Sequence, residues 1–228
     1  MLLLDSVADA LMPRFCIVCG RRLALGEKHL CLICLMKLPV IPYKNGELSS
    51  TEILLMGEPL LVRAASYFRY RKESGYSRIL YHLKYFGHPE VGLWMARQAA
   101  SRLVQEGFFE GVDCIIPVPL SKAKQRRRGY NQSEYIARGL SQVTGIPVEK
   151  ELVCRLIDNQ SQARKGGIER WENVEGIFSV RDAARLEGCH VLVVDDVITT
   201  GATISSLLET ISSASNVRVS VFSLGLAG

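Results

Sequence analysis

The stretch VLVVDDVITTGAT, residues 191–203, constrains the fold more than any other part of the chain. Its four leading apolar residues are typical of a strand buried on both faces, as in the parallel sheet of an α/β protein. Two aspartates follow, and a turn of threonine and glycine then opens an apolar run with helical spacing. In open α/β sheets, ligands bind beyond the carboxyl ends of the strands. The stretch therefore predicts a parallel sheet and a ligand site at its edge.

Strand-like and helix-like segments alternate along the rest of the chain. Short apolar runs between turn residues predict strands at 59–70, 112–120, 190–196 and 217–227, with a further candidate at 152–156. Helical apolar spacing predicts helices at 74–87, 90–107, 131–145 and 200–216. Such alternation is typical of α/β proteins. We therefore expect an α/β fold in which helices flank a mainly parallel sheet.

The composition is that of an ordinary globular protein. Of the 228 residues, 48% are hydrophobic and 22% are charged, and no apolar run reaches the length of about 18 residues that a transmembrane helix needs. Asp5 and Asp9 interrupt the apolar start of the chain, which predicts a short amphipathic helix ending at Pro13 and argues against a signal peptide. We expect a cytoplasmic protein with an N-terminal helix and cysteine module at 1–45, and a larger domain at 58–228.

Four of the seven cysteines have the spacing of a metal site. Cys16, Cys19, Cys31 and Cys34 form the pattern C-x2-C-x11-C-x2-C, in which each pair can direct two thiolates at one point. Four sulfur ligands make the closed tetrahedral site that suits structural Zn²⁺. The alternatives are redox-active cysteines or chance. Zinc is expected because there are two pairs, and because a segment of about 40 residues is too short for a core of its own.

The turn after the 190–196 strand has the groups that a phosphate and a ribose require. Backbone N–H groups at a helix N-terminus bind phosphate, and a glycine lets the ligand come close. The expected phosphate contacts are Thr199, Thr200, Gly201, Ala202 and Thr203. Asp195 and Asp196 can accept hydrogen bonds from two neighbouring ribose hydroxyls. Helix capping is the alternative, but it accounts for one acidic residue and not for two.

This stretch closely resembles the signature of phosphoribosyltransferases that use 5-phosphoribosyl 1-pyrophosphate (PRPP). Further segments resemble the ComF family over almost the whole chain: the cysteine module, KYFG (84–87), PVPL (117–120), RRGYNQ (127–132) and the run from Gln162 to Phe178. The resemblance implies a type I phosphoribosyltransferase fold with an N-terminal zinc module. It also implies a link to the uptake of transforming DNA, with other competence proteins as partners.

The same resemblance implies that pyrophosphate leaves from C1 of the ribose, so the site must neutralise a departing negative charge. Mg²⁺ that accompanies PRPP, together with basic side chains, would serve this purpose. The candidates after the 112–120 strand are Lys122, Arg126, Arg127 and Arg128. Arg170 lies in QARKGGIERWEN (162–173), whose adjacent glycines suggest a lid that closes over the reaction. For both stretches the alternative is a solvated charged surface.

Two functions remain open from the sequence. One is the transfer of phosphoribose from PRPP, with ammonia, a base or no acceptor at all as the alternatives for the second substrate. The other is a protein that binds PRPP without turnover and engages single-stranded DNA through the basic run at 121–132. Tyr130, Trp94 and Trp171 would then stack on bases, although packing also explains each of them. Both functions need the same PRPP pocket.

Overall fold

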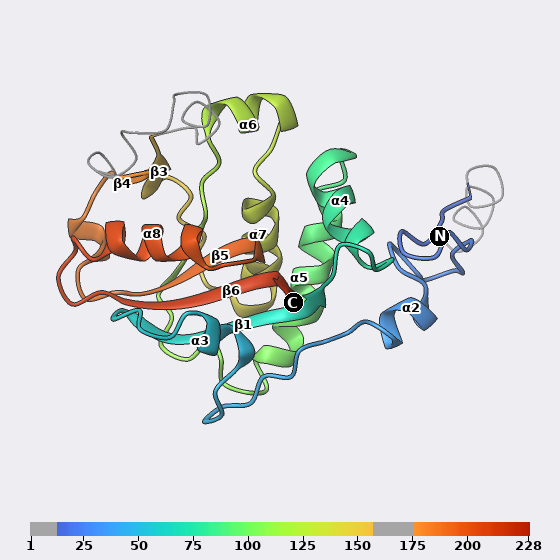
Figure 1. Cartoon of the computed structure of the whole chain (residues 1–228), viewed down its shortest axis with the longest axis horizontal. Coiled ribbons are helices and arrows are strands. Elements are labelled where there is room, and N and C mark those ends of the chain that lie inside the picture. The colour runs from blue at the N-terminus through green and yellow to red at the C-terminus, as the bar shows by residue number, and fades with distance from the viewer. Residues whose placement is uncertain (1–12, 157–175) are drawn as a thin grey trace.

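The computed structural model describes residues 13–156 and 176–228, and at its centre lies a four-stranded sheet (Figure 1). Across the sheet the strands follow the order β1 (Leu61–Tyr70), β6 (Arg218–Ala227), β5 (His190–Ile198) and β2 (Cys114–Pro117). All neighbouring strands are parallel, which confirms the predicted α/β class. Because parallel strands end at the same edge of a sheet, the segments that follow β2 and β5 emerge side by side.

The central strand β5 is buried on both faces, as its apolar run predicts. Residues 191–194 have no exposed surface. Leu192 and Val194 pack into one hydrophobic cluster, whereas Val191 and Val193 pack into the cluster on the opposite face. The strand also extends beyond its predicted end, since residues up to Ile198 pair with β6. The two aspartates therefore lie near the C-terminal end of the paired strand β5 and not in a loop.

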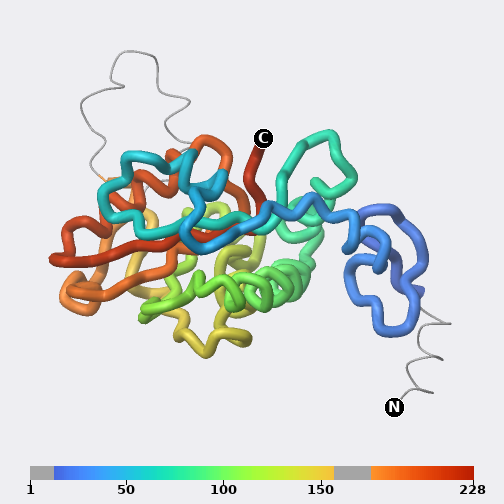
Figure 2. The backbone as a smooth tube through the Cα atoms, turned by 90° about the horizontal axis from the view of Figure 1, so that it is seen from below, coloured from blue at the N-terminus to red at the C-terminus, as the bar shows by residue number. Residues whose placement is uncertain are grey.

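Helices cover both faces of the sheet. Figure 2 shows α5 (Glu90–Leu103) and α7 (Gln132–Thr144) on one side, and α3 (Ser50–Leu54) and α8 (Ala202–Ile211) on the other. The α4 helix (Ser77–Tyr85) packs into the same hydrophobic cluster as α5 and α7.

The α5 and α7 helices are in close contact. A Cβ atom on Gly139 of α7 would lie only 2.4 Å from the carbonyl oxygen of Leu93 in α5. Any larger residue at this position would force the helices apart. The close approach fixes α7, and with it the residues at the N-terminal end of α7 that face β5.

The edge of the sheet at β1 is covered. The Ala64 N–H donates to Glu52 Oε1 at 3.0 Å, and the Ala64 carbonyl accepts from the hydroxyl of Ser49. Further along the strand, Arg69 N–H donates to Pro39 O at 2.8 Å, and Ile41 N–H donates to Tyr67 O at 3.0 Å. An uncovered strand edge invites pairing with another chain, so these contacts protect the sheet.

The cysteine module packs directly against the α/β domain. It includes the short helix α2 (Leu32–Met36) and lies beside α4 (Figure 1). Arg78 of α4 donates to the Val18 carbonyl at 3.1 Å, and the Tyr76 hydroxyl donates to the Cys34 carbonyl at 3.1 Å. Three of the four cysteines share a hydrophobic cluster with α4 and α5. The module is therefore fixed in position relative to the sheet.

Two segments differ from the sequence-based expectation. The basic run after β2 forms a helix, α6 (Lys122–Arg128), which begins at the capping residue Ser121 and ends at Gly129 with a φ of 81°. The segment at 152–156 contributes β3 (Val153–Arg155), which pairs antiparallel with β4 (Phe178–Val180) outside the main sheet. The predicted N-terminal helix and the predicted lid fall outside the described residues. No helix in the described part of the chain is long and apolar enough to cross a membrane.

Candidate functional site

The turn between β5 and α8 leaves the N-terminus of a ten-residue helix open. Gly201 has a φ of 82°, and a Cβ there would lie 3.0 Å from Leu55 Cδ2, so both the backbone conformation and the available space require glycine. No described side chain makes a capping hydrogen bond at this terminus. A side-chain contact beside it is long, 3.5 Å from Ala202 N to Thr200 Oγ1. The first N–H groups of α8 are therefore accessible to a ligand.

A small hollow surrounds this helix terminus. It is lined by Asp195, Val197 and the residues from 198 to 204, which include every predicted phosphate contact: Thr199, Thr200, Gly201, Ala202 and Thr203. The structure thus brings one of the two aspartates and the predicted phosphate turn together. Because the aspartates do not cap α8, the helix-capping interpretation does not explain them.

Asp195 is held by α7. Its Oδ1 accepts a hydrogen bond of 3.1 Å from Ser133 Oγ and one of 2.8 Å from the backbone N–H of Asp196. Burial raises the pKa of Asp195 to about 7, and the neighbouring charge of Asp196 acts in the same direction. Lys84 and the two hydrogen bonds lower the pKa of Asp195 but do not outweigh these causes. Asp195 can therefore gain or lose a proton near neutral pH.

Asp196 is paired with a lysine from another part of the chain. Its Oδ2 lies 3.0 Å from Lys84 Nζ, and the two side chains are 4% and 21% exposed. Lys84 lies in the last turn of α4, within the KYFG segment noted in the sequence. Sequence reasoning gave this lysine no role, because nothing local connects α4 with β5. The KYFG motif was the only signal that could have found it.

The predicted pyrophosphate contacts lie at the same edge of the sheet, on α6. Lys122, Arg126, Arg127 and Arg128 belong to this helix, which has no buried residue. Arg128 Nη1 donates to Gln132 Oε1, and the guanidinium carbon of Arg128 lies 5.6 Å from the centre of the Tyr85 ring. The other predicted contact, Arg170, lies outside the described residues.

The aromatic residues proposed for base stacking have other contacts. The hydroxyl of Tyr130 donates to the Leu83 carbonyl at 2.7 Å, which ties the α6–α7 turn to the end of α4. Trp94 is partly buried against the core and lies edge-on to His29 at 5.6 Å between ring centres. Trp171 lies outside the described residues. Tyr130 and Trp94 therefore have structural contacts that the sequence could not show.

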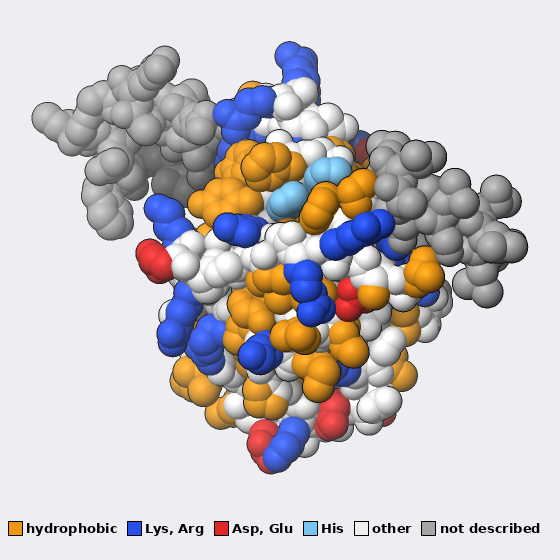
Figure 3. Space-filling model, turned by 90° about the vertical axis from the view of Figure 1, so that its right-hand side faces the viewer, with side chains coloured by type: hydrophobic (Ala, Val, Ile, Leu, Met, Phe, Trp, Pro, Cys, Tyr) orange, Lys and Arg blue, Asp and Glu red, His pale blue; other side chains and the backbone are white. Residues whose placement is uncertain are grey.

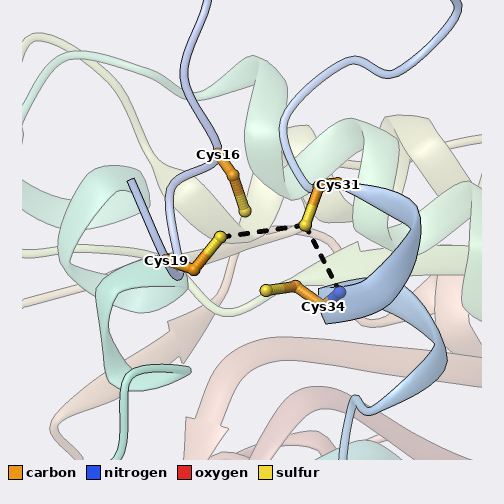
Figure 4. Close-up of side chains that lie close together, drawn as sticks. All are labelled: Cys16, Cys19, Cys31 and Cys34. Carbon is orange, nitrogen blue, oxygen red and sulfur yellow. Dashed lines mark hydrogen bonds between the residues drawn. The ribbon is translucent and has the colours of Figure 1, made fainter. Parts of the chain in front are cut away.

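The four predicted metal ligands come together. The sulfur atoms of Cys16, Cys19, Cys31 and Cys34 all lie within 4.8 Å of one another (Figure 4). The separation of 3.8 Å between Cys19 Sγ and Cys31 Sγ is too long for a disulfide, whose S–S bond is about 2 Å. It matches the separation of about 3.8 Å for two sulfur ligands that each lie 2.3 Å from a tetrahedral ion.

The protein backbone favours a thiolate within this cluster. Although burial raises the pKa of Cys16, hydrogen bonds from the backbone N–H groups of Cys19, Cys31 and Val18 outweigh it and lower the pKa to about 7. Burial and the neighbouring thiols raise the pKa of Cys34. The lowered pKa of Cys16 favours the deprotonated form that metal ligation requires. The cluster can hold one metal ion.

Three relatives are similar to this chain in sequence. "DNA utilization protein YhgH" of Escherichia coli is 26% identical over 212 residues, which cover 87% of this chain and 90% of that protein. "Competence protein F" of Haemophilus influenzae is 26% identical over 234 residues, which cover 93% and 96%. "Competence protein ComFC" of Bacillus subtilis is 33% identical over 90 residues, which cover 40% and 34%. No protein-family model matches the chain.

Two solved structures align with part of this chain. Hypoxanthine phosphoribosyltransferase of Trypanosoma cruzi aligns with a TM-score of 0.37 and 17% identity, covering 60% of this chain and 67% of that one. UMP synthase of Leishmania donovani aligns with a TM-score of 0.33 and 16% identity, covering 63% of this chain and 22% of that one.

Proposed function

Since this chain is a homologue of the ComF/YhgH competence proteins over most of its length, we propose that it binds PRPP at the carboxyl end of β5. We further propose that it transfers the phosphoribosyl group to an acceptor and thereby serves DNA uptake. The observation that carries this proposal is the open N-terminus of α8, which lies next to a pair of carboxylates at the end of the central strand. A sugar phosphate with free hydroxyls has the matching groups.

The proposed contacts of the ligand are as follows. The 5′-phosphate binds backbone N–H groups within residues 199–203 and the hydroxyl of Thr203. Asp195 and Asp196 accept hydrogen bonds from the ribose hydroxyls. The diphosphate extends toward α6, where Lys122 and Arg126–Arg128 supply positive charge at the same edge of the sheet. Mg²⁺ bound to the diphosphate would neutralise part of its charge.

The reaction is a substitution at C1 of the ribose. A nucleophilic atom of the acceptor forms a bond to C1 while the bond between C1 and the pyrophosphate oxygen breaks, and the electron pair leaves with pyrophosphate. The acceptor then loses a proton. Basic side chains on α6, and Arg170 from the 162–173 segment, stabilise the charge that develops on the leaving group. Asp195 and Asp196 stabilise the positive charge that develops on the ribose.

Calorimetry with PRPP and Mg²⁺ tests the proposal. Wild type is expected to bind, and Asp196→Ala and Thr203→Val are expected to weaken binding by at least about tenfold, or about 1.4 kcal/mol each. Asp182→Ala changes an exposed acid outside the site and is the matched control. The absence of binding to wild type would reject the PRPP site. Binding without pyrophosphate release, against ammonia and a panel of bases, would reject the transferase function alone.

We also propose that the four-cysteine cluster holds one structural Zn²⁺. Four sulfur ligands leave no open coordination position, so this ion stabilises the module and takes no part in catalysis. The contacts of the module with α4 suggest that it supports the helix that carries Lys84. The division into 1–45 and 58–228 and the cytoplasmic location remain part of this proposal.

A second candidate function is PRPP binding without turnover, combined with binding of single-stranded DNA. The observation that favours it is a group of exposed rings in the second half of α4 and at its C-cap, Tyr81, Tyr85 and Phe86, which are 37%, 63% and 63% exposed. Arg128 of α6 lies over one of these rings. Figure 3 shows hydrophobic and histidine side chains between Lys and Arg side chains on this side of the molecule. Exposed rings among cations suit unpaired bases and phosphates.

A further inference from the structure

The proposed PRPP site includes a positively charged side chain that lies outside the sequence stretch 191–203. Lys84 Nζ lies 3.0 Å from Asp196 Oδ2 and comes from α4, which packs into a different hydrophobic cluster from α8. We propose that Lys84 is a positioning residue of this site, whose ammonium group orients the carboxylate of Asp196 toward the ribose hydroxyls. This inference rests on the proposed function of PRPP binding.

The burial of Asp196 makes a counter-ion necessary. Its side chain is only 4% exposed, and a buried carboxylate without a partner is strongly unfavourable. Apart from the ion pair, Asp196 Oδ2 has no hydrogen-bond partner among the described residues. Oδ2 is itself buried, and a carboxylate has two oxygens, so the ion pair at Oδ2 leaves Oδ1 as the atom that would accept from a ligand hydroxyl. The surface pair of Lys44 and Glu47, at 64% and 67% exposure, has no such constraint.

The position of Lys84 is fixed by residues at the end of α6 and directly after it. The Tyr130 hydroxyl holds the carbonyl of Leu83, the residue before Lys84. Arg128 packs over the ring of Tyr85, the residue after it. These contacts fix the end of α4 from which the long Lys84 side chain extends, and so limit the positions that its ammonium group can reach.

The same segment also holds the other carboxylate. Ser133, three residues after Tyr130, donates to Asp195 Oδ1 at 3.1 Å. Asn131 anchors the segment to the end of β2 through a hydrogen bond of 3.0 Å to the Val118 carbonyl. The 128–133 segment therefore positions both acids, Asp195 directly and Asp196 through Lys84.

The lysine also affects the protonation of Asp195. Lys84 lowers the pKa of Asp195, which burial and the charge of Asp196 raise. The titratable groups acting here are the two aspartates of β5, Lys84 of α4 and Tyr70 of β1, a tyrosine whose own pKa burial raises and Lys84 lowers. Loss of the lysine moves the ionisation of Asp195 to higher pH. Because hydroxyl donors favour an ionised carboxylate, the pH dependence of ribose binding should move with it.

The test compares two ligands with each variant by calorimetry. Ribose 5-phosphate probes the contacts with the hydroxyls and the phosphate, and inorganic pyrophosphate with Mg²⁺ probes the leaving-group side. Lys84→Met is expected to weaken binding of ribose 5-phosphate at least about tenfold near pH 7, with a smaller loss near pH 9, and to leave pyrophosphate binding within about twofold. Lys84→Arg should keep most of the affinity. Lys44→Met, which removes the exposed lysine of a surface pair, is the matched control.

The possible outcomes separate the inference from the proposed function. If wild type binds neither PRPP nor ribose 5-phosphate, the proposed function fails. If wild type binds and Lys84→Met has the same affinity and pH profile, the inference is wrong and the function stands. Equal losses for both ligands at every pH would show a merely structural role and would also overturn it.

A second variant keeps the inference testable if Lys84→Met does not fold. Tyr130→Phe removes only the hydroxyl that holds Leu83. It is expected to weaken ribose 5-phosphate binding several-fold without a change in pyrophosphate binding. Unchanged affinity for ribose 5-phosphate in folded Tyr130→Phe would contradict the inference.

Discussion

Replacement of Asp195 by asparagine tests whether the ionised Asp195 carboxylate lowers the free energy of unfolding. The pKa of Asp195 is raised from 3.8 to about 7 by burial and by the charge of Asp196. The folded protein therefore keeps this proton to a higher pH than the unfolded chain does. The free energy of unfolding is expected to fall as the pH rises from about 4 to about 7, and this loss is complete above that range. Asparagine cannot ionise, so Asp195→Asn removes the loss.

The magnitude follows from the size of the pKa shift. A shift of one unit corresponds to about 1.4 kcal/mol, and the rise from 3.8 to about 7 is roughly three units. Ionisation of Asp195 therefore lowers the free energy of unfolding by up to about 4 kcal/mol near pH 8. This is an upper value, because the residue is partly exposed and water screens its charge. The asparagine oxygen can still accept the hydrogen bonds from Ser133 and from the Asp196 N–H.

Urea unfolding of the wild type and Asp195→Asn between about pH 5 and pH 8.5 measures this difference. The variant is expected to be more stable near pH 8, by an amount that shrinks as the pH falls. Both proteins carry the same cysteine cluster, so its own pH dependence cancels. Asp182→Asn, at an exposed acid, should show no such trend.

The result that would refute the reasoning is a variant no more stable than wild type near pH 8, or a stability difference that does not change with pH. PRPP with Mg²⁺ provides a second comparison. A ligand at about 100 times its Kd stabilises the folded state by about 2.7 kcal/mol. Wild type should gain this stability when PRPP binds. Asp195→Asn should gain much less, because the substitution removes a carboxylate that contacts the ligand.

Two further predictions concern the metal and DNA. Purified wild type should contain one zinc per chain by elemental analysis, whereas Cys16→Ser should lose both the zinc and the hydrogen-exchange protection of residues 14–38. Cys154→Ser, which lies outside the cluster, is the control. Zinc-free wild type would reject the site. Binding of single-stranded DNA can be measured by fluorescence anisotropy. In a variant with alanine at Arg126–Arg128, the slope of log affinity against log salt concentration should fall by about 0.7 for each phosphate contact removed. Tyr85→Ala should weaken binding at all salt concentrations. Unchanged affinity in both variants would exclude this surface, and competition by PRPP would show that it overlaps the site.

Much of the fold could be predicted from local sequence patterns. The apolar run of β5 predicts a strand buried on both faces, and the structure confirms this. The helix at 131–145 was expected to stop at Gly145, and α7 does end there with a φ of 76°. The basic run at 122–128 was not recognised as a helix. Its capping serine and its terminal glycine were both visible in the sequence, but the run has no apolar face and α6 buries no residue.

The sequence by itself determined most of the elements, the cysteine cluster and the turn at the end of β5, because apolar periodicity, turn residues and paired cysteines act over a few neighbouring positions. Only the tertiary structure decided what surrounds the two aspartates. Ser133 reaches Asp195 across 62 positions of the chain, and Lys84 reaches Asp196 from a helix that precedes β2. Such contacts depend on how α4 and α7 pack against the sheet. The packing sets the burial of each carboxylate and the distance to its partner, which no local pattern encodes.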